Sequence, residues 1–205
     1  AYISAGLPVF DVFSINFQLG QGKLSVGNTL LGSIFLSEYL ESDAYAQLSF
    51  YSPKIRYAAT TIQLEVNKYL YLHRLELKPI KQLEFGILEG VLVNAPLELR
   101  YLNPLTVFHN YSAWRSYGAY NKGQVDGDVK TYDGTSRIGS YFGLTIDANP
   151  WKYMRLYGLF AMNQFQTKYE RENFPEGAGK IPDSLGFQAG AQTYIPYRSG
   201  YFSGG

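Results

Sequence analysis

Few residues of this chain have the types and spacing that catalysis or metal binding needs. The two histidines, His73 and His109, form neither an HxH nor an HExxH motif. A glycine-rich stretch contains Asp126, Asp128 and Asp133, but it lacks the full ligand pattern of a calcium-binding loop. The chain has no cysteine, which excludes disulfides and thiolate metal ligands. The sequence therefore predicts a protein that is not an enzyme and holds no metal or cofactor.

A second set of charged residues alternates with apolar ones, so that the charges share one face of the predicted strands. These residues are Arg74, Glu76, Lys78, Glu84, Glu98 and Arg100. If the apolar alternates face lipid, the charges point into the interior of a barrel. There they form cross-strand ion pairs or line a polar passage, and a bound sugar or anion is a further alternative.

An aromatic-dense stretch covers residues 103–118. Its side chains Tyr111, Trp114 and Tyr117 are candidates for stacking on a carbohydrate at the mouth of a barrel. The same residues suit an aromatic girdle at the membrane interface, or a loop packed into the mouth. The composition favours this girdle or packing role over glycan binding.

The strands that must position these residues are separated by four short turns, each with a proline and a nearby basic residue. The turns are Ser52–Arg56, Lys78–Lys81, Asn149–Lys152 and Ile195–Arg198. The connections on the other side are long, near 94–138 and 164–184, apart from a short polar link near 65–68. Short turns at one end and long loops at the other are typical of a transmembrane β-barrel.

Alternation of apolar and polar residues supports strands beside these turns. The clearest case is a hairpin formed by residues 140–148 and 153–163. Residues 66–77 also fit helical spacing, but the mirrored alternation after Pro79 favours a second hairpin. Near the start of the chain, a strand over 13–18 is expected to end at a Gly20–Gly22 turn.

Composition is consistent with an all-β protein. Tyrosine, phenylalanine and glycine are abundant, and charged residues make up 17% of the 205 residues. The net charge of +1 gives no basic footprint, so no nucleic-acid partner is expected. No apolar run is long enough for a membrane-spanning helix.

These patterns predict a single domain over residues 1–205, an antiparallel up-and-down transmembrane β-barrel with roughly eight to ten strands in this chain. A new strand is expected after the turn at Ile195–Arg198, only a few residues before Gly205. Since a closed barrel leaves no strand edge unpaired, we expect the chain to be a portion of a larger barrel.

The order of several motifs resembles the capsule-assembly (Wzi-like) family of bacterial outer-membrane barrels and its uncharacterised relatives. The residues Gly20–Asn28 and Gly32–Ser37 resemble a G…WG…G…LxLS signature of that family. The resemblance continues in order through Tyr71–Glu76, Arg100–Pro104 and the Leu144–Phe160 hairpin.

This resemblance implies a barrel in the bacterial outer membrane that contacts lipid and has a structural or binding role at the cell surface, holding surface polysaccharide. It identifies no catalytic residue and no protein partner. Two alternatives stay open: a porin or specific channel for small polar solutes, and a soluble all-β ligand carrier.

Overall fold

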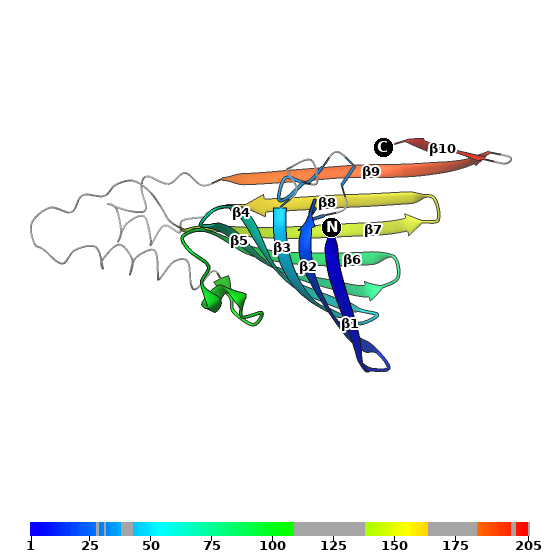
Figure 1. The fold of residues 1–205 in the computed structure, drawn as a ribbon. Helices are drawn as coiled ribbons and strands as arrows, with labels where there is room; N and C mark the ends of the chain where they lie inside the picture. Colours follow the sequence, from blue (N-terminus) through cyan, green and yellow to red (C-terminus); the bar gives the residue numbers. More distant parts are fainter. Residues whose placement is uncertain are drawn as a thin grey trace, which may run out of the picture.

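In the computed structural model, the described residues of the chain form one ten-stranded antiparallel sheet in which each strand pairs with its neighbours in sequence (Figure 1). The structure describes residues 1–27, 29–30, 32–37, 43–108, 138–163, 184–197 and 200–204. The strands are β1 (Tyr2–Phe10), β2 (Phe13–Gly22), β3 (Asp43–Tyr51), β4 (Ile55–Glu65), β5 (Lys68–Ile80), β6 (Leu83–Asn94), β7 (Ile138–Trp151), β8 (Met154–Met162), β9 (Leu185–Tyr197) and β10 (Gly200–Gly204). A 3-10 helix, η1, covers Leu99–Leu102.

The all-β, up-and-down prediction is therefore confirmed, whereas the sheet itself is open, with β1 and β10 as its two edges. The helical alternative for residues 66–77 is excluded because β5 runs through this region and pairs with both β4 and β6. In the described ranges of the chain, no helix has the length and apolar character that a membrane crossing requires.

Tight turns gather at one end of the sheet, as the sequence predicts. They connect β1 to β2, β3 to β4, β5 to β6 and β7 to β8. At the other end only the β4–β5 link is tight, and it contains Asn67 with a φ of 59°. The connections from β2 to β3, β6 to β7 and β8 to β9 are long.

Three prolines at this end of the sheet lie at the ends of strands, whereas the sequence pattern predicted prolines within the turns. Pro79 and Pro150 lie in the last residues of β5 and β7, where the pairing register shifts, and not in the turns themselves. Pro8 stands at a third such shift, near the end of β1. A proline has no N–H to donate to the ladder, so it is tolerated where a bulge interrupts the pairing.

The predicted turn at Gly20–Gly22 is wrong, and β1 was not predicted. Both glycines belong to β2, which continues to Gly22 and pairs with β1 on one side and β3 on the other. A Cβ on Gly20 would lie 2.4 Å from the Cβ of Tyr2. Glycine therefore allows β1 to approach closely here and does not break the strand.

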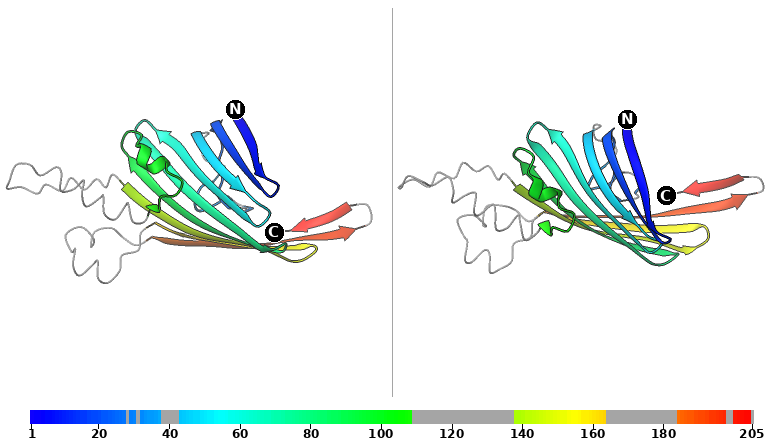
Figure 2. Two further views of the ribbon diagram at one scale, coloured as in Figure 1. Left: turned by 90° about the horizontal axis from the view of Figure 1, so that it is seen from below. Right: turned by 60° about the horizontal axis from the view of Figure 1, so that its bottom comes forward.

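The sheet is strongly curved (Figure 2), and the side chains of its two faces differ in chemistry. The convex face carries exposed apolar side chains along every strand pair, among them Phe17, Ile55, Leu77, Phe85, Ile87, Leu144, Ile146, Leu156 and Phe187. The concave face carries the alternate residues, which are mainly polar or small. This separation of the two faces follows from the period of two along a strand.

One segment lies across each face. The inner segment, defined here as the described residues of 23–37, crosses the concave face, where the N–H of Val26 donates to the carbonyl of Leu36 at 2.9 Å. It packs on a buried cluster made of Tyr45, Ile62, Leu70, Leu72 and Leu88. It reaches as far as β9, since the side-chain amide of Gln188 donates to the carbonyl of Gly32 at 2.9 Å.

The outer segment, defined as residues 95–108, includes η1 and lies on the convex face over β5 and β6. Its Tyr101 and Phe108 form a second buried cluster with Tyr71, Val91 and Val93. The sheet thus has two separate cores, one on each face, and both lie toward the end with the long connections.

Candidate functional site

The concave face near the tight turns holds a set of charged side chains that we call the charged belt. Its members are Arg56, Arg74, Glu76, Lys78, Glu84, Asp147 and Arg155. Cross-strand register brings them together: Arg56 lies opposite Glu76 on β4 and β5, and Glu84 lies opposite Asp147 on β6 and β7. Four predicted residues, Arg74, Glu76, Lys78 and Glu84, therefore share this face.

Glu76 is the centre of the belt and is only 4% exposed. Its carboxylate accepts a hydrogen bond from the Arg56 guanidinium at 3.1 Å and forms an ion pair with Arg74. Arg56 also lies over the ring of Tyr51, with 5.4 Å between its Cζ atom and the ring centroid. Two arginines thus share one buried carboxylate, which offsets the cost of removing these charges from water.

A second ion pair links β7 and β8. The Nε atom of Arg155 donates to both carboxylate oxygens of Asp147, at 3.1 and 2.8 Å. Another nitrogen of Arg155 donates to the side-chain oxygen of Gln192 on β9 at 2.7 Å. Neither Asp147 nor Arg155 was among the charged residues predicted to share this face. The signal was present, because both lie in the one hairpin whose register is clear from sequence.

The predicted strand placement of Glu98 and Arg100 is wrong. Both residues lie in the outer segment, where Glu98 precedes η1 and forms an ion pair with Arg100. The strand β6 ends at Asn94, and Pro96 cannot donate to a further ladder bond. Residues 99–102 of this alternating stretch form the 3-10 helix η1, and Tyr101 is buried against Tyr71, with stacked rings 5.0 Å apart.

The aromatic residues Tyr111, Trp114 and Tyr117 lie outside the described residues. Their girdle, packing or glycan-stacking role stays a prediction.

The belt contains four basic and three acidic side chains, and the ion pairs of Arg56 and Arg74 with Glu76 and of Arg155 with Asp147 all lie within it. A small cavity separates part of it from the inner segment and is lined by Gly27, Thr29, Arg74, Glu84, Asp147 and Tyr157, among others. Among the described residues, no group of three or more His, Asp or Glu side chains could hold a metal ion. This arrangement places paired charges of both signs on one face of the sheet.

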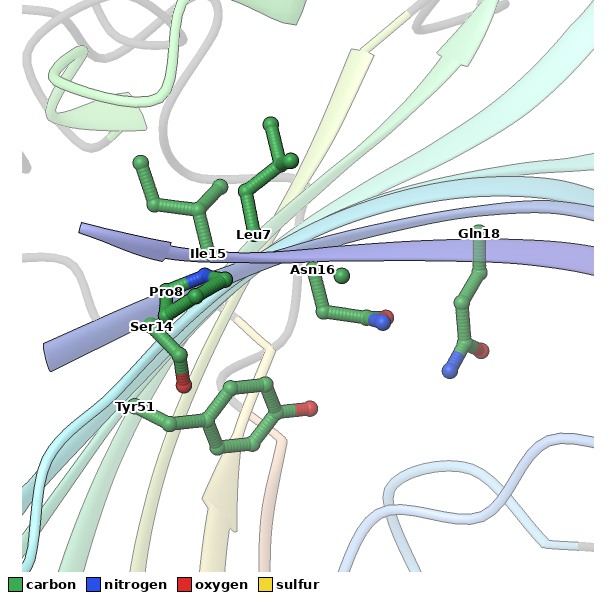
Figure 3. Close-up of a pocket in the computed structure, with 8 residues that line it drawn as sticks. Leu7, Pro8, Ser14, Ile15, Asn16, Gln18 and Tyr51 are labelled. Carbon is green, nitrogen blue, oxygen red and sulfur yellow. The ribbon is translucent and has the colours of Figure 1, made fainter.

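The concave side of β1–β3 near the tight turns differs from the belt because the residues there are uncharged. Ser14, Asn16, Gln18 and Tyr51 line a shallow pocket there, and Figure 3 shows them directed away from Leu7 and Ile15 on the opposite face. The side-chain amide of Asn16 donates to the hydroxyl of Ser4 at 2.9 Å. This area offers neutral donors and acceptors of the kind that bind hydroxyl groups.

The packing of the inner segment on β7 gives a first testable prediction. A Cβ at Gly143 would lie 2.9 and 3.1 Å from two ring carbons of Phe35. We expect Gly143→Val to displace Phe35 and to speed the labelling of a cysteine introduced at Ser33 about tenfold, which corresponds to about 1.4 kcal/mol. The loss of a partly buried phenylalanine contact is of that order.

Gly139→Val is the matched control for this prediction. It lies on the same strand and face, and its Cβ would meet no atom closer than 3.9 Å. Equal labelling rates for the two valine variants would contradict the packing of Phe35 on Gly143. Because the chain has no cysteine, the introduced thiol is the sole reporter.

No protein-family model, curated protein or solved structure matches this chain.

Proposed function

We propose that the chain is part of a transmembrane β-barrel of the bacterial outer membrane, in which further strands join the edges at β1 and β10. The observation that carries this proposal is the exposed apolar convex face, which extends from β1 to β9. A water-soluble protein rarely exposes so large a continuous apolar surface, whereas lipid covers it at no cost.

The strand dimensions fit a bilayer. The strand β5 has 13 residues. At about 3.4 Å per residue and a tilt of about 40°, such a strand rises about 34 Å, which exceeds the apolar band of about 25 Å. The charged belt then faces the interior, where paired charges are tolerated.

For its role, we propose a structural and binding barrel at the cell surface that holds surface polysaccharide. The resemblance of Gly20–Asn28 and the later motifs to capsule-assembly barrels supports this role, as do the uncharged polar groups on β1–β3. A porin or solute channel is the second candidate, and the polar concave face favours it. The inner segment counts against an open passage, because it covers part of that face.

The membrane location and the role can be tested separately. We expect the folded protein to enter the detergent-rich phase on phase separation and to migrate differently in gels before and after boiling. Partition into the aqueous phase with identical migration would favour the soluble ligand carrier. Once the protein is in bilayers, binding on a glycan array with little conductance supports the tether, and steady conductance supports the channel.

A further inference from the structure

The outer segment is firmly attached to the convex face by its aromatic residues. The ring of Phe108 stacks on His73 with 4.1 Å between ring centroids. The hydroxyl of Tyr57 donates to the carbonyl of Pro104, and His73 forms a hydrogen bond with the backbone of Thr106. Three strands, β4 to β6, therefore hold the underside of the segment in place.

The side of this segment that faces away from the sheet is mainly aliphatic, although Asn103 is exposed as well. Leu105 is 87% exposed and Leu99 is 78% exposed. The exposed aliphatic residues of the segment are Leu97, Leu99, Leu102, Leu105 and Val107. Its two charged residues, Glu98 and Arg100, form an ion pair with each other. The segment thus buries its aromatic residues against the sheet and presents leucines outward.

The height of the outer segment above Leu77, measured perpendicular to the membrane plane, can be derived from β5. Tyr71, His73 and Leu77 lie on the same face of that strand. Tyr71 is six residues from Leu77, the exposed leucine of β5, which lies near the tight turn. At about 3.4 Å per residue and a tilt of about 40°, Tyr71 lies about 16 Å above Leu77 and His73 about 10 Å above it. An apolar band of about 25 Å that begins at Leu77 therefore includes the residues under the outer segment.

We propose that the outer segment is itself a lipid-contacting surface. Over β4–β6 the segment, and not the sheet beneath it, contacts the lipid. Its leucines then lie among the acyl chains of the leaflet nearer the long connections. Since the segment lies on top of the convex face, whatever covers that face on the neighbouring strands also meets its outer side. The inference rests on the proposed membrane location, and it goes further by assigning lipid contact to a connection that leaves the sheet.

Single cysteines labelled with the fluorophore NBD test this proposal on the full chain, which has no cysteine of its own. Leu105→Cys and Leu99→Cys report on the outer segment, Leu144→Cys on the convex face and Gln18→Cys on the concave face. Each labelled protein is folded into phosphatidylcholine vesicles with and without doxyl-labelled lipid. We expect quenching at Leu105 and Leu99 to equal that at Leu144 and to be several-fold stronger than at Gln18.

The outcomes separate this proposal from the membrane location. Quenching at Leu144 with none at Leu105 or Leu99 above the Gln18 level would overturn the lipid contact of the outer segment alone. No quenching at any of the four positions would overturn both proposals. Quenching at Leu105 and Leu99 without quenching at Leu144 would retain the lipid contact and remove the transmembrane sheet.

Discussion

Glu76→Gln is expected to lower the free energy of unfolding by about 3 kcal/mol, because it breaks a buried pair by removing one partner. Glu76 is the carboxylate that both Arg56 and Arg74 contact. Without its charge, the guanidinium of Arg74, which is only 24% exposed, would stay in the interior with no anionic partner. The change in stability can be measured by urea titration of the protein folded in detergent or vesicles.

Glu65→Gln is the matched control for this experiment. Glu65, the last residue of β4, also forms an ion pair, with Lys68 at the start of β5 at 3.0 Å. The side chain of Glu65 is 70% exposed. Exposed pairs contribute little, so we expect a change within about 0.5 kcal/mol. If the two glutamine variants had the same stability, Glu76 would not be the centre of the charged belt.

If the convex face contacts lipid as proposed, Phe17→Arg is expected to destabilise the protein in vesicles by about 2–4 kcal/mol, the cost of a charge near the middle of the lipid-facing surface of a barrel. Phe17 is near the middle of β2 and is 47% exposed on the convex face. The cost arises because lipid cannot solvate the guanidinium, whereas water could. Comparing unfolding in vesicles for the variant and the parent protein measures this cost.

The neighbouring residue supplies the control, because successive side chains of a strand point to opposite faces. Gln18→Arg places the same charge on the concave face of the same strand, where we expect a change of less than about 1 kcal/mol. An equal loss in both variants would indicate a general intolerance of β2 to arginine. Little loss in either would count against lipid on the convex face.

The stability of an open sheet depends on what covers its apolar convex face. The buried clusters under the inner and outer segments cover only the part of the sheet near the long connections. The rest of the convex face has no second layer of protein among the described residues. A sheet with one uncovered apolar face and two free edges needs an external apolar phase or further strands.

Local patterns in the sequence were enough to predict most of the strands and the two faces of the sheet. The period of two identifies the face that Arg74, Glu76 and Glu84 share, and the prolines identify the end with tight turns. Both signals act over a few residues, because a strand alternates its side chains and a proline lacks an N–H wherever it lies. The β7–β8 hairpin was predictable for the same reason.

Contacts between distant residues decided the rest. Glu98 and Arg100 lie in the outer segment and not on a strand, because Tyr101 and Phe108 are buried on Tyr71 and His73. The inclusion of Gly20 in a strand depends on how closely β1 approaches it. The path of the inner segment across the concave face depends on seven strands, β3 to β9, because the segment contacts all of them. A periodic pattern carries no information about which distant side chains will meet, so only the tertiary structure could determine these features.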